Sequence, residues 1–160
     1  MRLTLMTDYA LRLLMYLAQQ PDRLCTIAEI AAAHQVSEAH LSKITHQLGV
    51  AGWLETVRGK GGGMRLAMEP GDINLGSVVR SFEPDFVLVE CFAPGSSCVL
   101  TGRCGLAVVL NEALLRFLEH LDTFTLADIA AGQRKKPVRV PKTSLPTVLR
   151  SPAQRPARVR

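Results

Sequence analysis

Two short helical segments joined by a very short turn constrain the fold of this chain more than any other feature. Thr26 and Glu29 match a capping box, in which each side chain satisfies an unpaired backbone N–H at the start of a helix that ends near His34. Ser37 is a suitable cap for the next helix, over about 37–48. Because helices joined this tightly do not easily lie antiparallel, the pattern predicts a helix-turn-helix.

The flanking segments extend this unit into a winged helix-turn-helix. Thr7 is expected to cap a first helix that ends before Pro21. Short strands are expected over 54–58 and 64–67, with a glycine-rich segment, 59–63, between them. Glycines allow positive φ and close backbone approach, so this hairpin is predicted to form a wing.

A polar helix face and a basic hairpin predict DNA as the partner. The second helix of a helix-turn-helix enters the major groove, where base edges carry a distinguishing pattern of donors and acceptors. The outward side chains expected to meet DNA are those of Ser37, Ala39, His40, Lys43, His46 and Gln47. Arg58, Lys60 and Arg65 of the wing are expected at phosphate or in the adjacent minor groove. A winged helix that binds protein would share this core, but a basic glycine-rich wing favours DNA.

Charge is divided unevenly along the chain. Residues 133–160 hold nine Lys and Arg and no acid, whereas residues 1–132 hold ten basic residues against all 14 acids, a net charge of −4. DNA affinity in these first residues must therefore come from local placement of positive charge. The tail has five prolines and little apolar periodicity, and is predicted to be disordered. It either adds non-specific affinity for phosphate or serves as a solubilising extension.

Two further helical patterns follow the wing. Asn74 is expected to cap a short helix over 75–82, and apolar residues recur at i, i+3, i+4 and i+7 from Leu106 to Leu121. The winged domain is too small to cover both patterns. We therefore expect two chains to pair across a two-fold axis.

Three cysteines lie in the loop between these two patterns. Cys91, Cys98 and Cys104 are separated by six and then five residues. Thiolates are soft ligands that suit iron-sulfur clusters, zinc or copper(I), and zinc sites usually show a ligand pair roughly two to four residues apart, which is missing here. The wider spacing suits a bulkier centre, and three structural thiols without a metal are the alternative.

A cluster normally takes four protein ligands, and the loop supplies three. Cys25, a histidine, a carboxylate or an exogenous group could be the fourth, although Cys25 is expected to be a buried, inert thiol. The sequence thus predicts a mainly α protein in three parts. A winged helix-turn-helix DNA-binding domain spans 1–70, a cluster-binding loop and long C-terminal dimerisation helix span 71–130, and the basic tail spans 131–160.

Four stretches together resemble a known family. The opening TDYALR, the stretch IAEIAAAHQVSEAHLSKITHQL, the wing ETVRGKGGGMRLA and the segment PDFVLVECF with its spaced cysteines are similar to the NsrR branch of the winged-helix iron-sulfur repressors. The resemblance covers about residues 1–130 and leaves the tail outside. It implies a homodimeric repressor that binds a palindromic operator on double-stranded DNA and holds a [4Fe-4S] cluster. Nitric oxide would attack that cluster and release genes for nitric oxide detoxification.

Carried over by position, the resemblance implies Cys91, Cys98 and Cys104 as cluster ligands and Asp8 of the partner subunit as the fourth. Relatives of the IscR type, which hold a [2Fe-2S] cluster, have a histidine three residues after the third cysteine, where this chain has Ala107. The [2Fe-2S] cluster is kept as the alternative. An acid in the first turn of a helix is also favoured by the helix dipole alone, so Asp8 has a second explanation.

Two other functions stay open. One is a winged-helix regulator of iron-sulfur or iron homeostasis that senses cluster occupancy, and the other is a small iron-sulfur electron carrier. An enzyme is not expected, because the chain shows no nucleophile–base pair, cofactor-binding glycine fingerprint or paired carboxylates in one segment. No run reaches the roughly 18 to 20 apolar residues of a membrane span, and Asp8 and Arg12 interrupt the apolar stretch that a signal peptide needs. A cytoplasmic location is therefore expected.

Overall fold

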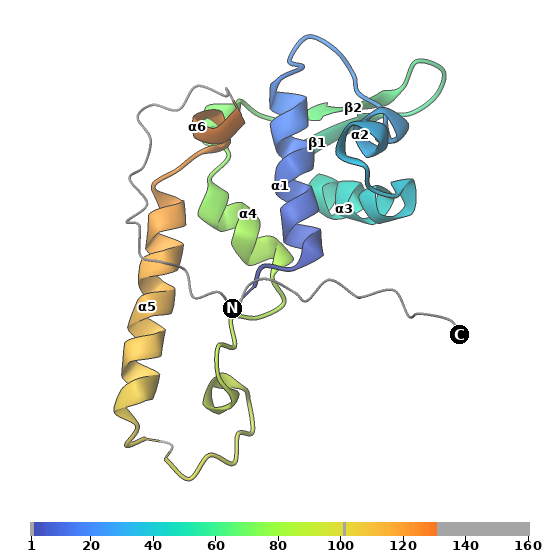
Figure 1. Cartoon of the computed structure of the whole chain (residues 1–160). Coiled ribbons are helices and arrows are strands. Elements are labelled where there is room, and N and C mark those ends of the chain that lie inside the picture. Colours follow the sequence, from blue (N-terminus) through green and yellow to red (C-terminus); the bar gives the residue numbers. More distant parts are fainter. Residues whose placement is uncertain (1, 101, 131–160) are drawn as a thin grey trace, which may run out of the picture.

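The computed structural model describes residues 2–100 and 102–130 and is mainly helical, with one small antiparallel sheet (Figure 1). In chain order its elements are α1 (Leu5–Ala18), α2 (Ile27–His34), α3 (Glu38–Val50), β1 (Leu54–Val57), β2 (Gly63–Leu66), the 3-10 helix η1 (Pro70–Asp72), α4 (Leu75–Phe82), the 3-10 helix η2 (Glu90–Phe92), α5 (Gly105–Asp122) and α6 (Leu126–Ala130). The mainly α winged-helix fold predicted from the sequence is confirmed. The basic tail predicted over 131–160 lies outside the described residues.

The helix-turn-helix forms as its caps predict. Thr26 Oγ1 accepts a hydrogen bond from Glu29 N at 3.2 Å, and Ser37 Oγ accepts one from His40 N at 3.3 Å. Each helix therefore begins on a side chain that satisfies a backbone donor of its first turn. Gln35, the C-cap of α2, has a left-handed backbone with a φ of 55°. This residue turns the chain sharply from α2 into α3.

The first helix begins earlier than predicted. Thr4, and not Thr7, is its N-cap, with Oγ1 accepting a hydrogen bond from Thr7 N at 3.3 Å. Thr7 is fully buried, and its hydroxyl donates to Glu83, the C-cap of α4. The prediction for Thr7 was wrong because two threonines precede the same apolar stripe, and a contact with a residue far along the chain decides between them.

The wing is an antiparallel hairpin of β1 and β2. Gly59 and Gly61 in its turn have φ values of 101° and 79°, which L side chains rarely adopt. Strand β2 is bonded to the segment before α2, because Cys25 N donates to Met64 O at 2.9 Å and Met64 N donates to Cys25 O at 2.8 Å. The glycine-rich segment therefore forms the predicted turn, and the wing is tied to the helix-turn-helix.

One hydrophobic cluster joins the helix-turn-helix to segments that follow the wing. Its large, fully buried side chains include Leu13, Leu14, Ile30, Ile44, Leu48, Ile73, Val78 and Leu126. They come from α1, α2, α3, α4, α6 and the residue that follows η1. We call residues 2–82 and 123–130, which share this cluster, the body.

The long helix α5 is fastened to the body through α4. Arg80 of α4 and Asp122 at the end of α5 form a two-point ion pair, with both N–O distances at 2.6 Å. Gly76 makes room for it, since a Cβ at this position would collide with the Asp122 carboxylate. The absence of a side chain at Gly76 thus lets the end of α5 lie close against α4.

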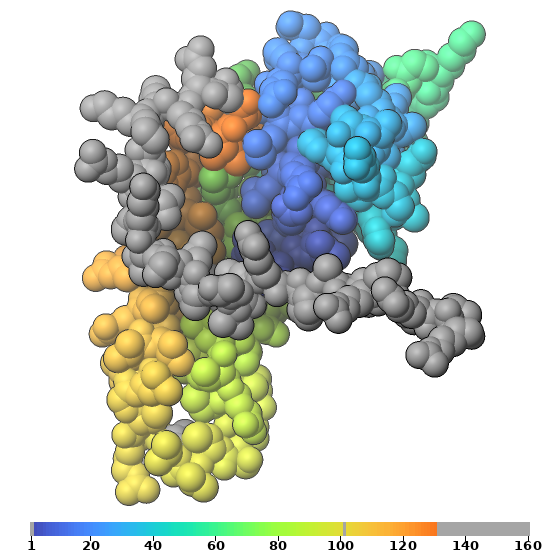
Figure 2. All heavy atoms as spheres, in the orientation of Figure 1, coloured from blue at the N-terminus to red at the C-terminus, as the bar shows by residue number. Residues whose placement is uncertain are grey.

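The rest of α5 extends past the body. Its side chains lie outside the main hydrophobic cluster, and only Leu114 and Leu118 of this helix are buried. Residues 83–100 leave the end of α4 and run alongside α5, and residues 102–104 lead into its N-terminus (Figure 1). We call residues 83–100 and 102–104, together with α5, the arm, which projects beneath the body in Figure 2. No helix within residues 2–100 and 102–130 combines the length and apolarity that crossing a bilayer requires.

Candidate DNA interface and cysteine pocket

The second helix of the helix-turn-helix, α3, presents the predicted DNA-contacting residues to solvent. Ser37, Ala39, His40, Lys43, His46 and Gln47 are all exposed. Leu41, Ile44 and Leu48 are buried on the opposite face of the helix. Ser37 and His40 also share a side-chain hydrogen bond, Oγ to Nδ1 at 3.0 Å, which holds the imidazole at the start of α3. The polar face is therefore available to a partner, and its contact with DNA stays a prediction.

The three basic residues of the wing differ in their surroundings. Arg65 pairs with Glu55 directly across the hairpin, with Nη2 and Nε both 2.8 Å from Oε2. Arg58 and Lys60 are exposed near the turn, and neither has an ion-pair partner within the described part of the chain. The sequence places an acid, Glu55, and a base, Arg65, on the two expected strands of the wing. Predicting that they form an ion pair required the strand register, which places them directly opposite each other.

A shallow hollow lies where α3 meets strand β1 of the wing. It has a volume of about 400 Å³ and is lined by Ser42, Thr45, His46, Gly49, Val50, Leu54 and Thr56. His46 is thus shared between the exposed face of α3 and this hollow. The helix and the first strand of the wing border one concave surface.

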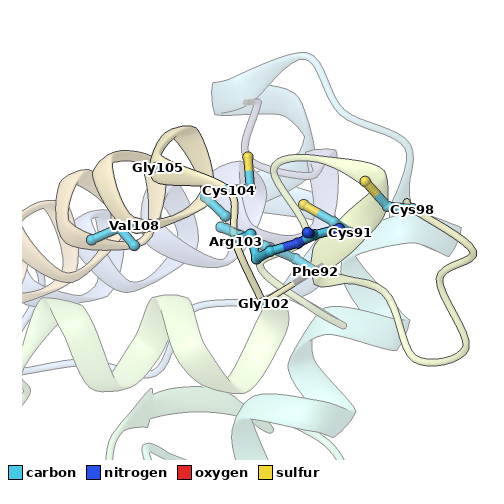
Figure 3. Close-up of a pocket in the computed structure, with 9 residues that line it drawn as sticks. Cys91, Phe92, Cys98, Gly102, Arg103, Cys104, Gly105 and Val108 are labelled. Atoms are coloured by element: carbon cyan, nitrogen blue, oxygen red, sulfur yellow. The ribbon is translucent and has the colours of Figure 1, made fainter. Parts of the chain in front are cut away.

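The three loop cysteines line one cavity on the arm (Figure 3). The cavity has a volume of about 500 Å³, and its lining also includes Phe92, Gly102, Arg103, Gly105, Ala107 and Val108. Cys91 lies in η2, Cys98 follows in the loop, and Cys104 immediately precedes α5. All three side chains are half-buried. The structure therefore brings together the three residues that the spacing singled out.

The N-terminus of α5 borders the same cavity. Cys104 is its N-cap but makes no side-chain hydrogen bond to the helix, so the first backbone N–H groups carry the positive end of the helix dipole without that partner. Arg103 adds a full positive charge beside it. Both features favour a negatively charged ligand in the cavity.

The three cavity cysteines are spread too widely to bind one metal ion together. Within residues 2–100 and 102–130, no three His, Cys, Asp or Glu side chains come close enough to hold a single metal ion. The sulfur atoms stand apart around the cavity in Figure 3. Three separated soft thiolates fit a multi-atom iron-sulfur cluster, in which different ligands bind different irons, better than they fit one ion.

Asp8, the predicted fourth ligand, lies apart from this cavity. Its carboxylate pairs with Arg12 one turn further along α1, with Arg12 Nη2 at 2.8 Å from Oδ2 and Nε donating to Oδ1 at 3.1 Å. Asp8 does not line the cavity of its own chain. A ligand role for Asp8 therefore depends on a second copy of the chain or on another position of the arm.

Glu83 links the start of α1 to the cysteine segment, a role that sequence reasoning missed. Its carboxylate accepts hydrogen bonds from Thr4 N at 2.8 Å, from Thr4 Oγ1 at 3.3 Å and from the Thr7 hydroxyl. Asp8 follows Thr7 directly, so these bonds hold the Asp8 end of α1 against the start of the segment that leads to Cys91. An acid before a proline at a helix end was the only local signal for this link.

The fourth cysteine lies in the body, away from the cavity. Cys25 is fully buried, and burial raises the pKa of its thiol, so the thiol stays protonated. A protonated thiol is neither a good nucleophile nor a good metal ligand. The predicted burial of Cys25 is confirmed, and its chemistry disfavours it as the fourth ligand.

Apolar side chains of α5 are exposed along the arm. Leu106 is 63% exposed and Val109 61%, and these two residues lie one turn apart on one face of the helix. Leu115, which is 50% exposed, points to the opposite side of α5 from Leu106. Neighbouring exposed apolar side chains on one helix face mark a candidate interaction site. We call Leu106 and Val109 the α5 face.

The chain resembles known transcriptional regulators over most of its length. A family model described as Rrf2, iron-dependent transcriptional regulator, matches residues 3–132. The HTH-type transcriptional regulator NsrR of Bacillus subtilis (strain 168) is 51% identical over 135 residues, which cover 83% of this chain and 92% of that protein. Its namesake in Geobacillus kaustophilus (strain HTA426) is 51% identical over 131 residues, covering 81% and 89%. Among solved structures, T. potens IscR superposes with a TM-score of 0.65 and 27% identity, covering 81% of this chain and 85% of that one.

Proposed function

We propose that this chain, which belongs to the Rrf2 family of transcriptional regulators, is a repressor that senses nitric oxide through an iron-sulfur cluster. The proposal includes control of genes for nitric oxide detoxification in the cytoplasm. The observation that carries it is the cavity bordered by Cys91, Cys98 and Cys104 together. The relatives named NsrR support it, because they match 81–83% of this chain.

DNA binding is assigned to α3 and the wing. The exposed polar face of α3 supplies donors of the kind that read base edges in the major groove, and Arg58 and Lys60 are placed to neutralise phosphate. Arg65 is a weaker phosphate ligand in this proposal, because Glu55 already neutralises it. Two copies of α3 in a symmetric dimer would read the two halves of a palindromic operator.

Dimerisation is assigned to the α5 face. Burying Leu106 and Val109 against the same face of a second copy removes apolar surface from water, which is favourable at about 25 cal/mol per Å². A two-fold axis lets one patch serve both partners.

The residues proposed to hold the cluster are Cys91, Cys98 and Cys104 of one chain and Asp8 of the partner subunit. A bound [4Fe-4S] cluster would supply iron atoms as the target of nitric oxide. The thiols belong to the arm, whereas Asp8 belongs to α1, which packs on α3. A cluster bound by ligands from both parts would hold the α3 helices of the dimer in one relative orientation. Loss of the cluster would let that orientation change. Arg12, the present partner of Asp8, would take up its carboxylate again after release.

A regulator of iron-sulfur or iron homeostasis is the second candidate. The family model is described as an iron-dependent regulator, which favours a protein that senses iron supply or cluster occupancy. The same cavity would serve this function with either a [4Fe-4S] or a [2Fe-2S] cluster, so the site alone does not separate the two candidates. An electron carrier is not retained, because the matched relatives are transcriptional regulators.

The deciding experiment uses protein purified without oxygen. Visible absorbance and an iron count establish whether a cluster is bound, and operator affinity is then followed while nitric oxide, oxygen or an iron chelator is added. The proposal expects loss of both absorbance and operator affinity at low nitric oxide. A colourless protein that binds its operator equally tightly, or a response to the chelator alone, would reject the proposed sensing of nitric oxide.

A further inference from the structure

We propose that Ser37 holds the imidazole of His40 in the tautomer that carries its proton on Nε2, and that this N–H reads a guanine in each half of the operator. The proposed function assigns DNA binding to the whole polar face of α3, whereas this role names one side chain, its proton and the base that it selects. It rests on that DNA binding, but on neither the cluster nor nitric oxide.

Two contacts join Ser37 to His40 at the start of α3. Ser37 Oγ accepts a hydrogen bond from the backbone N–H of His40 at 3.3 Å, and it lies 3.0 Å from Nδ1 of the same residue. The N-cap hydroxyl is therefore shared between the backbone and the ring of one residue. This leaves the imidazole with one nitrogen bound to the protein and one, Nε2, for a partner.

The hydroxyl of Ser37 decides which ring nitrogen carries the proton. A hydroxyl has one proton and two lone pairs, and here one lone pair already accepts the amide N–H. Accepting that bond makes the hydroxyl a stronger donor, and Nδ1 lies within its reach. A neutral imidazole that accepts at Nδ1 carries its proton on Nε2. Nε2 is thus a hydrogen-bond donor.

This Nε2–H is available to a partner molecule. His40 is exposed, and no hydrogen bond within residues 2–100 and 102–130 engages its Nε2. The opposite face of α3 is anchored by Leu41 and Ile44, which are buried. A donor whose ring is held before binding loses less conformational entropy on contact. Ser37 therefore preorganises the donor as well as setting its proton.

His40 lies where a recognition helix meets base edges. It is the third residue of α3, and the N-terminal residues of the second helix of a helix-turn-helix contact bases in the major groove. Lys43 lies about one turn further along the same face, is exposed, and has no ion pair within the described part of the chain. Its ammonium can only donate hydrogen bonds. The start of α3 therefore offers two consecutive donors to the groove.

Guanine is the base that such donors select. Its major-groove edge carries two acceptors, N7 and O6, and no donor. Adenine places an amino donor beside N7, cytosine offers an amino donor, and thymine places a methyl group beside its acceptor. A fixed N–H at His40 would meet a donor or a methyl group on each of these other edges. A guanine is therefore expected at one base pair in each half-site, with Lys43 favouring an acceptor on the neighbouring pair.

The test selects duplexes from a random pool with the full chain, purified without oxygen, and compares the enriched bases between variants. His40→Ala removes the donor, and Ser37→Gly removes the hydroxyl but keeps a residue that is nearly as good a helix cap. Ser37→Thr keeps a hydroxyl at this position. Thr26→Gly is the matched control, because it removes the cap hydroxyl of α2 and leaves Ser37 and His40 in place. Circular dichroism confirms that all variants are folded.

The wild-type chain should enrich a guanine at one symmetric base pair. His40→Ala should lower that preference by about fivefold or more, as expected for the loss of one base contact. Ser37→Gly should lower the same preference by a smaller factor, because the ring is then no longer held. Ser37→Thr and Thr26→Gly should leave it unchanged.

Unchanged base preferences in His40→Ala, with the rest of the palindrome intact, would overturn this role while DNA reading by α3 stands. A uniform loss of affinity for all sequences would place His40 at a phosphate and would also overturn it. Full guanine preference in Ser37→Gly would show that Ser37 does not set the donor. Failure of the wild-type chain to enrich any sequence would instead reject the DNA binding of the proposed function, and this role with it.

Discussion

The body buries its large apolar side chains within one chain, whereas the arm leaves several of them exposed to solvent. In the body, Leu14, Ile44 and Leu48 are fully buried in a cluster built by one chain. In the arm, more than half of Leu106 and Val109 is exposed. The two regions also treat cysteine differently, since Cys25 of the body is buried and protonated whereas the arm cysteines line an accessible cavity.

This contrast indicates which region is complete in one chain. A domain that buries its core within one chain is stabilised by its own packing. An exposed apolar helix and a cavity lined by thiols are stabilised instead when a second chain or a metal cluster binds to them. The body should therefore keep its fold under changes that remove cluster and dimer, and the arm should not. Four measurements test this difference between the body and the arm.

Replacing an arm cysteine should abolish cofactor binding without unfolding the body. Cys91→Ala removes one of three thiolates at the cavity, so we expect loss of cluster absorbance and of bound iron in protein purified without oxygen. The control is Cys25→Ala, which removes a thiol of the body and should leave absorbance intact. Full absorbance in Cys91→Ala would show that the cavity is not the cluster site.

Truncating a leucine should be costly in the body and nearly neutral at an exposed position of α5 in an isolated chain. Leu14→Ala leaves a cavity in a closed core, and such changes cost about 2–5 kcal/mol of unfolding free energy. Leu115→Ala removes a side chain that is half exposed, and should cost well under half as much. Denaturant unfolding at low protein concentration measures both. Equal losses would mean that the arm is packed as tightly as the body.

The sequence predicted the body well because its signals are local. Thr26, Ser37 and Asn74 were expected as helix caps, and each accepts a hydrogen bond from the backbone N–H three residues ahead. Each of these caps makes its hydrogen bond within its own first turn, so the signal for it lies in the local sequence. The glycine turn of the wing was predictable for the same reason, since its φ values depend on the turn itself.

Contacts between distant segments could not be predicted. Thr4 and Thr7 are equivalent as caps until Glu83, 76 residues beyond Thr7, accepts the Thr7 hydroxyl. For the candidate site, the spacing of the three cysteines in one loop was enough to predict that they lie around a common site. It could not place Asp8, which lies on another element and pairs with Arg12.

Adding a charge to the α5 face should separate the dimer and weaken operator binding. Val109→Glu places a carboxylate where apolar surface is expected to meet a second copy, and an unpaired buried charge is strongly unfavourable. We expect a monomer by mass in solution and a loss of operator affinity of at least about tenfold, or ~1.4 kcal/mol.

Asn111→Glu adds the same charge to the same helix at an exposed position pointing away from Val109, and serves as the control. A dimer that survives Val109→Glu but not Asn111→Glu would place the interface on the other side of α5.

The smallest effect should come from one carboxylate that ties α1 to α2 in the body. Arg23 and Tyr16 both hydrogen-bond Glu29, the latter at 2.6 Å, and they lower the pKa of Glu29 to about 2 from an ordinary value of 4.5. A lowered carboxyl pKa adds stability that is complete above pH 4.5 and is lost as the pH falls toward 2. Glu29→Gln should therefore lower the melting temperature at neutral pH and flatten its decline over this acid window. Tyr16→Phe keeps the arginine but removes one donor, so it should flatten the decline only in part. A decline that keeps its full steepness in Glu29→Gln would mean that other carboxyl groups, such as Asp122 at the base of the arm, set the acid stability of the chain.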